Sequence, residues 1–244
     1  MDGILDSKYA EERQKKKYLE FRYKERALVA AWMVRLFLPS YKQMANFQIL
    51  DLGAAEGLAL LEMSRKLKHG FYLGLEYDQS LIDIAPKMPA NVVLRRGDAN
   101  RLIDIEDNSI DVVSALAILE HLGDIELAIK EIKRVLKPGG ILIATSPIDF
   151  WDKLSDKLGP KNHFGGDHHV FEVNKKSFTN LMVQEKLDFI YFHKFMWAPV
   201  GFLPYLKLSI SPSVAWFLDR FFWKIKIFNF LFVNQCFVAR KNID

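Results

Sequence analysis

The chain has 244 residues, of which 50% are hydrophobic and 26% are charged, with a formal net charge of +4 at pH 7. This length and apolar content suffice for one large domain with a sizeable core. The single cysteine, Cys236, excludes an internal disulfide and fits a reducing compartment. Residues 1–17 are too charged for a secretory signal, and no uncharged run approaches the roughly 18 apolar residues of a membrane-spanning helix. We therefore expect a cytoplasmic protein, either free or attached to the inner face of a membrane.

The charges are unevenly distributed. Residues 1–35 carry nine Lys/Arg against six Asp/Glu, or +3, and residues 194–244 carry seven against two, or +5. The centre, 36–193, carries eighteen against twenty-two, or −4. Solvated surface is the default explanation, and attraction to an anionic surface is the alternative. The basic residues form no dense stripe and no nucleic-acid-binding motif is visible, so we expect no nucleic-acid partner.

Helical and strand patterns follow one another along the chain. Residues 7–38 predict a helix, because apolar residues recur there at three- and four-residue steps and Pro39 ends the pattern. Residues 148–173 read as a loop-rich insertion, and the aromatic segment 198–231 as two helical pieces broken around Pro212. The expected strands lie at 47–53, 70–77, 91–96, within 109–119, 141–147, 188–197 and 232–241, and further helices at 56–67, 80–87, 124–137 and 174–187.

The alternation of short apolar strands with helices predicts an α/β protein. Runs rich in Val, Ile and Leu at this spacing are typical of a parallel sheet covered by helices on both faces. Pro138-Gly139-Gly140 is the expected stop signal of helix 124–137, and Asn174 the expected N-cap of helix 174–187. Ligands of such sheets bind at the carboxyl ends of the strands, so the residues that follow each strand are the candidates for function.

Small residues occupy alternate positions after the first expected strand, in ILDLGAAEG (residues 49–57). Gly53, Ala55 and Gly57 would let a ligand approach the main chain, and the following helix directs free N–H groups toward it. A dinucleotide fingerprint would need its last glycine at the position of Leu58, so that competitor fits poorly. A tight strand-to-helix turn without a ligand remains the alternative.

Carboxylates follow the second and third expected strands. Glu76, in GLEYD, lies 25 residues after Asp51, and its carboxylate could accept hydrogen bonds from both hydroxyls of a ribose. Asp98, in GDAN, could accept from an exocyclic amine such as that of adenine, while the N–H of Ala99 could meet a ring nitrogen. Solvation of Glu76 and an Asx-type turn at Asp98 are the alternatives.

Five ordered motifs between about Gln48 and Pro147 resemble one enzyme family. ILDLGAAEG, GLEYDQSLIDIA, GDANRL, DVVSALAILEHL and KEIKRVLKPGGILIATSP are similar to class I S-adenosylmethionine-dependent methyltransferases. The resemblance is to the branch of the ubiquinone/menaquinone-biosynthesis methyltransferases (methyltransferase type 11). HHVFEV and the terminal FVNQCFVARK also fit this branch. Ala55 departs from the family pattern, which usually has glycine there, and its methyl group should narrow the loop slightly.

The resemblance implies a Rossmann-like, doubly wound sheet of seven strands, mostly parallel with an antiparallel last strand. We expect one domain over 1–244: an N-terminal helical extension 1–40, a cofactor-binding core 41–147, an acceptor-side insertion with an aromatic helical region 148–231, and the last strand 232–244. The implied cofactor is S-adenosyl-L-methionine. Its methionine part would meet Asp51, Gly53, Ala55 and Gly57 and lie over Ser114 and Ala115, while Glu76 with the adjacent Tyr77 would hold the ribose, and Asp98 with Ala99 the adenine.

Histidines are the candidate general bases. The sulfonium of the cofactor already activates the methyl group, so the protein mainly aligns the reactants and excludes water. A hydroxyl or acidic C–H acceptor would need a base in addition. Of His121, His163, His168 and His169, we favour His121, which follows the fourth strand, and His169. The alternative for His121 is a helix-entry residue that packs beside Glu120.

The segment GGDHH (165–169) raises the question of a metal. Adjacent histidines point apart in most backbone conformations and no spaced set of partners accompanies them, so we predict no metal site. The glycines beside these histidines predict instead a mobile flap over the acceptor pocket.

The C-terminal region between Phe192 and Phe232 is dense in aromatic residues. One helical stripe, formed by Val214, Phe217, Leu218, Phe221, Phe222 and Ile225, is most simply the face that packs on the domain. The opposite side mixes aromatic residues with Arg220, Lys224 and Lys226, which suits a lipid interface. The segment is therefore expected to line an apolar acceptor pocket, to contact a membrane peripherally, or both, and a homodimer interface is the other explanation.

We therefore predict an S-adenosylmethionine-dependent methyltransferase that acts on a small-molecule acceptor, apolar or lipid-linked. The acceptor atom is not readable from the sequence. A non-catalytic S-adenosylmethionine-binding or scaffolding protein is the first alternative, because it would keep the nucleoside contacts without a usable acceptor pocket. A nicotinamide-dependent oxidoreductase is the second alternative, and the spacing of the glycines disfavours it.

Overall fold

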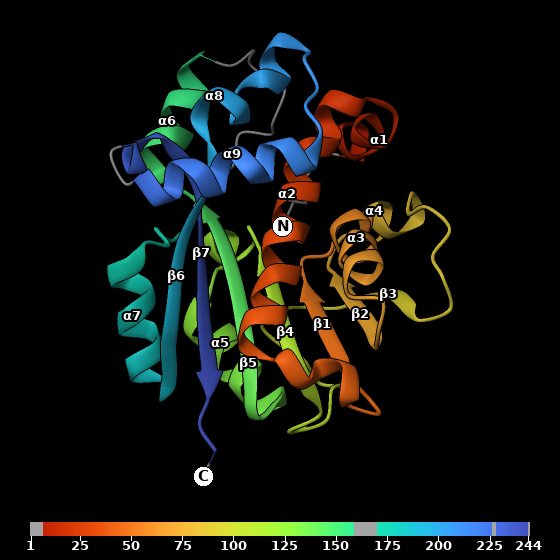
Figure 1. Cartoon of the computed structure of the whole chain (residues 1–244). Coiled ribbons are helices and arrows are strands. Elements are labelled where there is room, and N and C mark those ends of the chain that lie inside the picture. Colours follow the sequence, from red (N-terminus) through yellow and green to blue (C-terminus); the bar gives the residue numbers. More distant parts are fainter. Residues whose placement is uncertain (1–6, 159–169, 226–227, 244) are drawn as a thin grey trace.

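A computed structural model describes residues 7–158, 170–225 and 228–243, and its described part contains one seven-stranded sheet (Figure 1). The strand order is β3-β2-β1-β4-β5-β7-β6, and β7 runs antiparallel to both neighbours, β5 and β6. This confirms the predicted Rossmann-like sheet with its antiparallel last strand. The strands are β1 Gln48–Leu52, β2 Phe71–Glu76, β3 Val92–Arg96, β4 Ile110–Leu116, β5 Leu136–Pro147, β6 Leu187–Trp197 and β7 Phe232–Lys241.

Helices cover both faces of this sheet and one of its ends. The α-helices are α1 Ser7–Lys15, α2 Lys17–Phe37, α3 Leu58–Leu67, α4 Gln79–Asp83, α5 Ile125–Val135, α6 Asp149–Leu158, α7 Lys175–Gln184, α8 Ala198–Gly201 and α9 Pro212–Ile225, and the 3-10 turns are η1 Pro39–Gln43, η2 Leu119–His121, η3 Leu203–Leu206 and η4 Asn229–Leu231.

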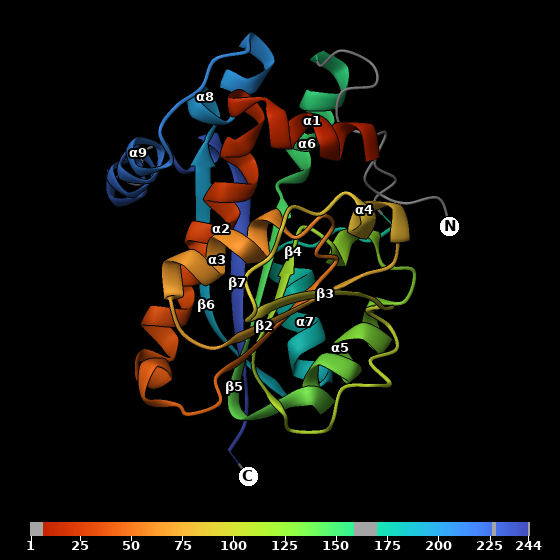
Figure 2. The same cartoon turned by 90° about the vertical axis from the view of Figure 1, so that its right-hand side faces the viewer.

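Alternating side chains of the central strands build two apolar cores. In β5, Leu142 and Ala144 pack with α5 and α7, whereas Ile141 and Ile143 pack with α2 and α3 on the other face. Figure 2, which views the sheet edge-on, shows these helix pairs on opposite sides of the strands. The strands are buried on both faces, which explains why their sequences read as continuous apolar runs rather than as alternating patterns.

A third group of helices lies beyond the carboxyl ends of the parallel strands. Figure 1 shows a layer of helices there, with α6, α8 and α9 above the tips of β5 and β6 and α1 beside them at the top of α2. We call this layer the cap. The cap therefore faces the same edge of the sheet at which the candidate ligand residues were expected.

Within the residues described, no helix combines the length and the apolar character needed to cross a membrane.

Several local expectations hold and others need correction. Asn174 is the N-cap of α7, and its side-chain oxygen accepts from the N–H groups of Lys176 and Ser177 at 2.9 and 3.0 Å. The expected helix 7–38 is two helices that meet at Lys16. Pro138-Gly139-Gly140 lies inside β5, because α5 already ends at Val135. The expected loop 148–173 contains α6, whose Asp149 pairs with Lys153 one turn later.

The prediction that the aromatic stripe of α9 packs on the domain is wrong. Phe217 is 66% exposed and Phe221 50% exposed, whereas Ala215 and Asp219 on the opposite side are buried. Pro212 begins this helix, as expected of a proline in a first turn. Both sides of α9 are apolar, so the periodicity locates the helix without deciding which side faces the domain.

Candidate cofactor-binding and active site

The register of the sheet brings the strand-end candidates to one edge. Asp51 lies between Gly74 of β2 and Ser114 of β4, and Leu52 lies between Leu75 and Ala115. Glu76 ends β2 one residue later, opposite Arg96, the last residue of β3. Asp98 follows two residues beyond β3. The structure therefore gathers residues of four separate motifs along a single edge, beneath the cap.

The loop after β1 turns through left-handed backbone at alternate residues. Gly53, Ala55 and Gly57 have φ angles of 65°, 49° and 77°. A Cβ atom on Gly53 would lie 2.7 Å from Cγ1 of Ile118, and one on Gly57 would lie 2.6 Å from Cε of Met88. Both glycines are therefore required by the turn and by neighbours within the chain itself. Ala55 adopts the same region at a conformational cost.

Glu76 is hydrogen-bonded to the main chain around it. One carboxylate oxygen accepts from the N–H of Ala55 at 2.8 Å, and the other accepts from the N–H of Asp78 at 3.0 Å. Each carboxylate oxygen has two lone pairs, so each can still accept from a hydroxyl group. Glu76 thus ties the β1 loop to the end of β2 and holds two acceptor atoms at that junction. Tyr77 is half exposed, with the guanidinium of Arg96 5.8 Å from its ring centroid.

Asp98 forms the Asx-type turn that the sequence offered as the alternative to a ligand contact. Its Oδ1 accepts from the N–H of Asn100 at 2.8 Å, and its main chain forms an isolated bridge with Arg101. Ala99 is partly buried against the core on the α5 side. A turn of this kind also fixes the carboxylate, and its remaining lone pairs can accept from an amine. The turn and the ligand interpretation of Asp98 are therefore compatible.

Asp51 lies beneath the loop and not on its surface. Its Oδ1 accepts a 2.6 Å hydrogen bond from Oγ of Ser114, and both side chains are buried, as is Ala115. Burial raises the pKa of Asp51 to about 7; the hydrogen bond from Ser114 opposes this shift and the charge of Glu76 adds to it. The pair joins β1 to β4 directly under the loop, which suits a role in positioning that loop.

Of the two favoured histidines, the structure describes His121. It ends η2, just past β4, where its N–H donates to the carbonyl of Ile118 at 3.0 Å, and it is partly exposed. Its neighbour Glu120 is buried, and the carbonyl of Glu120 accepts from the N–H groups of Val170 and Phe171. His169, like the rest of GGDHH and the predicted flap, lies outside the described residues. Among those described, no three His, Cys, Asp or Glu side chains come together as metal ligands would.

The N-terminal helices contribute basic residues that the strand-end motifs did not reveal. Arg13 of α1 forms an ion pair with Glu56 of the β1 loop, whose side chain is fully buried. On α2, burial and then the positive charge of Arg22 lower the pKa of Arg26, while the charge of Glu120 opposes this shift. Arg22 and Arg26 stand four residues apart on α2, and that spacing is the signal that sequence reasoning passed over.

This set of groups fits S-adenosylmethionine. The carboxylate of Glu76 suits a ribose diol, Asp98 suits an exocyclic amine, and Arg26 of α2 suits the carboxylate of an amino acid. The left-handed loop between Asp51 and Gly57 leads into α3 and presents the N-terminus of that helix at the same edge. The roles of the individual residues remain predictions.

Comparisons with known proteins point to the same family. The family model of the methyltransferase domain (Methyltransf_11) matches residues 50–144. A Mycolicibacterium smegmatis protein described as a probable S-adenosylmethionine-dependent methyltransferase is 28% identical over 143 residues, which are 57% of this chain and 51% of that protein. A demethylmenaquinone methyltransferase of Staphylococcus haemolyticus is 37% identical over 78 residues, or 31% of this chain and 32% of that relative. The matches thus span about half or less of these relatives.

A solved structure extends the likeness to the whole fold. The crystal structure of an S-adenosylmethionine-dependent methyltransferase from Archaeoglobus fulgidus superposes with a TM-score of 0.59 over 88% of this chain and 94% of the other, at 15% identity. It therefore shares the fold described above. Residues 50–144 of this chain thus match the methyltransferase domain, and the chain is similar to S-adenosylmethionine-dependent methyltransferases.

Proposed function

We propose that this protein transfers the methyl group of S-adenosylmethionine to a small-molecule acceptor that is apolar or lipid-linked. The observation that carries the proposal is the junction between the β1 loop and Glu76. Two carboxylate oxygens stand there beside a left-handed loop, within the segment that matches the methyltransferase domain.

The residues of the chain bind and orient the cofactor in this proposal. Glu76 accepts from the ribose hydroxyls, and Asp98 accepts from the adenine amine. The buried pair of Asp51 and Ser114 holds the loop in place beneath the methionine part. Arg26, whose Nε has no hydrogen-bond partner in the described part of the chain, offers a cation to the methionine carboxylate.

S-adenosylmethionine supplies a methyl group that its sulfonium already activates. The chain then has to align the acceptor and exclude water, and the cap is placed for both because it lies over the edge of the sheet that holds the candidate site. For an acceptor that must lose a proton, the ring of His121 just past β4 is the base that we propose from the described residues. The stacked rings of Trp197 and Phe222, 3.9 Å apart, and the buried Phe195 give this side of the molecule an apolar character that suits an apolar acceptor.

Two measurements test the proposal. Calorimetric titration with S-adenosylmethionine, S-adenosylhomocysteine and NAD should show binding of the first two ligands only. A cell extract incubated with the protein and radiolabelled methyl donor is then partitioned between organic and aqueous phases. Label in the organic phase supports an apolar acceptor, label in the aqueous phase replaces it with a polar one, and binding without any transfer contradicts the enzymatic proposal.

A further inference from the structure

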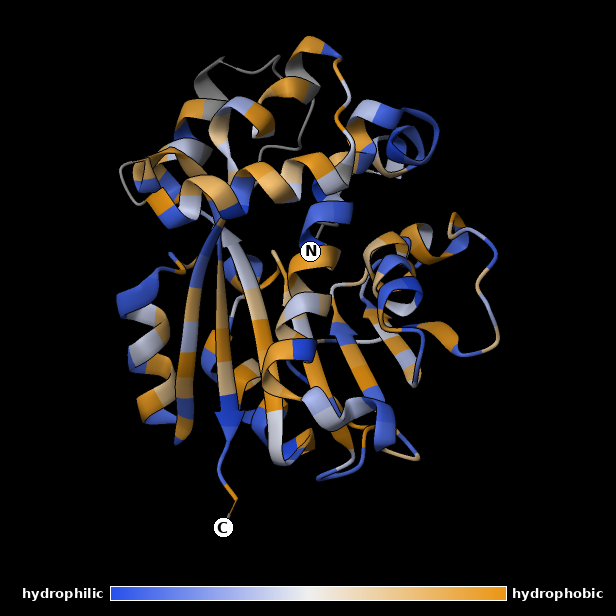
Figure 3. Cartoon of the chain, in the orientation of Figure 1, coloured by the Kyte–Doolittle hydropathy of each residue, from blue (hydrophilic) through white to orange (hydrophobic). Residues whose placement is uncertain are grey.

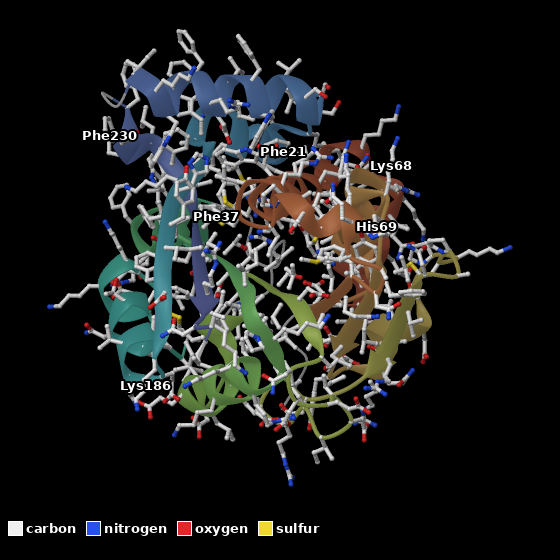
Figure 4. All side chains as sticks on the ribbon, turned by 60° about the horizontal axis from the view of Figure 1, so that its bottom comes forward. Phe21, Phe37, Lys68, His69, Lys186 and Phe230 are labelled. Atoms are coloured by element: carbon white, nitrogen blue, oxygen red, sulfur yellow. The ribbon has the colours of Figure 1, made fainter. Side chains whose placement is uncertain are left out.

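The outer side of α9 is an apolar surface that the described part of the chain leaves exposed. Val214, Phe217, Phe221 and Ile225 are 49%, 66%, 50% and 36% exposed. Exposed apolar residues continue on both flanks of the helix, with Leu206 and Leu208 before it and Phe228 and Phe230 after it. Figure 3 shows the hydrophobic colour along this outer helix, and Figure 4 places Phe230 beside it. We call the four exposed residues of the helix the α9 surface.

The α9 surface is one stripe of the helix. At 3.6 residues per turn, its four residues fall within an arc of about 80°. The buried residues Ala215 and Asp219 lie on the opposite side. Arg220 and Lys224 are exposed along one margin of the stripe. A helix with an apolar stripe and basic residues on its margin is the pattern of helices that lie in the plane of a lipid interface.

Contacts on its inner side hold α9 in this orientation. The carboxylate of Asp219 accepts from the N–H groups of Met196 and Trp197 at the end of β6, at 2.5 and 2.8 Å. The ring of Trp216 packs edge-on against Trp32 of α2, with centroids 5.2 Å apart. These contacts hold the side of α9 that carries Asp219 and Trp216 against the domain, so Phe217 and Phe221 face outward.

The segment that carries the α9 surface exposes side-chain charge of one sign. Between residues 198 and 243 the sequence contains a single carboxylate, Asp219, and that side chain is 1% exposed. Lys207, Arg220 and Lys224 are exposed on the same segment. This segment therefore combines exposed aromatic rings with cations and exposes no carboxylate side chain of its own, which is complementary to an anionic partner.

We propose that the α9 surface docks on an anionic lipid bilayer. Phe217 and Phe221 enter the boundary between headgroups and acyl chains, and Lys207, Arg220 and Lys224 contact anionic headgroups. A second copy of the chain fits this surface less well. A twofold dimer across α9 would bring these cations together without an exposed carboxylate from the same segment to oppose them.

This inference goes beyond the proposed function and does not depend on it. Figures 1 and 2 show α9 in the cap, on the side of the sheet that α2 covers and beyond the carboxyl ends of the strands. A bilayer on the α9 surface would thus lie on the same end of the molecule as the candidate cofactor site. If both proposals hold, an acceptor dissolved in the membrane reaches the site from the cap.

Vesicle flotation with the full chain tests the docking. Vesicles of phosphatidylcholine with about one third phosphatidylglycerol are compared with pure phosphatidylcholine at about 50 mM and about 500 mM salt. We expect flotation with the anionic vesicles that weakens at the higher salt concentration. Equal flotation with both kinds of vesicle, or none with either, overturns the proposal.

Paired variants keep the test specific to α9. Phe217→Ser with Phe221→Ser should reduce the bound fraction about tenfold or more. The matched control, Ile103→Ser with Val183→Ser, removes two side chains that are 74% and 72% exposed elsewhere and should float like the parent. Equal loss in both pairs would contradict a docking site on α9. Light scattering without lipid completes the test by comparing the parent with the Phe217/Phe221 variant. If the parent is a dimer and the variant is a monomer, the result overturns the docking proposal in favour of self-association.

Calorimetry with S-adenosylmethionine separates this proposal from the proposed function. The Phe217/Phe221 variant should bind the cofactor like the parent protein, because neither side chain belongs to the candidate cofactor site. Retained cofactor binding also shows that the variant is folded. Failure of the chain to bind S-adenosylmethionine would contradict the proposed function and leave the flotation result to decide the docking.

Discussion

The guanidinium of Arg13 and the carboxylate of Glu56 form a two-bond ion pair that joins α1 to the loop after β1. Nε and Nη2 of Arg13 each donate to one oxygen of Glu56, whose side chain is fully buried. One residue further along α1, Nε2 of Gln14 donates to the carbonyl of Ile84, beside α4, at 2.9 Å. Helix α1 is therefore anchored both to the loop after β1 and to the residue that follows α4, at the edge of the sheet that holds the candidate cofactor residues.

Loss of Arg13 should destabilise the protein strongly. Arg13→Gln leaves the buried carboxylate of Glu56 without its cation, which typically costs about 3–5 kcal/mol. Adding Glu56→Gln to Arg13→Gln removes that buried charge, so the double variant should be more stable than the sum of the two single changes predicts. Urea unfolding of the four proteins measures this coupling. The control is Arg65→Gln, which breaks an exposed pair with Glu62 and should cost about 0.5 kcal/mol or less. A similar loss for Arg13→Gln and Arg65→Gln would refute the expectation.

Substitution of Glu76 should weaken binding of S-adenosylmethionine. Glu76→Gln keeps an acceptor oxygen but removes the charge from the proposed hydrogen bonds to the ribose, so the dissociation constant should rise about tenfold or more. Calorimetry provides the measurement. Asp83→Asn is the matched control, because Asp83 is an exposed carboxylate of the nearby α4 that accepts from Gln79, and the charge change is the same. Unchanged affinity in Glu76→Gln would remove the ribose contact from the proposed site.

Glu25 should make stability depend on pH. It is fully buried in α2, and burial, followed by the negative charge of Asp219, raises the pKa of Glu25 to about 9. Burial also raises the pKa of Asp219 to about 6. Both carboxyl groups bind protons more tightly in the folded protein than in the unfolded chain. Their stabilisation is therefore complete below the unfolded pKa values and is lost as the pH rises through the folded ones.

The sign of this dependence can be checked with Glu25→Gln. Between about pH 6 and 8, the unfolding free energy of the parent should fall with a slope approaching about 1.4 kcal/mol per pH unit from Glu25 alone. The glutamine variant cannot ionise at this position, so its curve should be flatter in that range. Urea unfolding at several pH values provides both curves. Parallel curves for the two proteins would show that Glu25 does not titrate in this window.

Gly53 should tolerate a side chain less well than Gly139. Both residues have positive φ, 65° and 77°, so alanine is strained at each by about 1–2 kcal/mol. At Gly53 the added Cβ would also lie 2.7 Å from Ile118, whereas at Gly139 the nearest atom would be 3.5 Å away. Gly53→Ala should therefore cost about 1–3 kcal/mol more than Gly139→Ala in thermal or urea unfolding. Equal costs would show that the backbone angle alone explains the glycine in the loop.

The sequence predicts much of this structure because its signals are local. Short apolar runs ending in Asp51 and Glu76 mark buried parallel strands, and β7 occupies the predicted residues 232–241. The motifs also place their carboxylates at one edge, since parallel strands end together. Helix α6 was missed because the glycines and the single proline of 148–173 favour a loop interpretation of the whole segment.

Only the tertiary structure decides how distant segments meet. The sequence by itself determined the order of strands and helices and the family motifs at their ends, because hydrophobic periodicity and turn residues act over a few neighbours. It did not determine that Arg13 pairs with Glu56, 43 residues away, since many charged residues were available as partners. It also did not determine which side of α9 faces outward. Both sides of that helix are apolar, and the burial of Asp219 against the end of β6, which the fold alone sets, turns Phe217 and Phe221 to the surface.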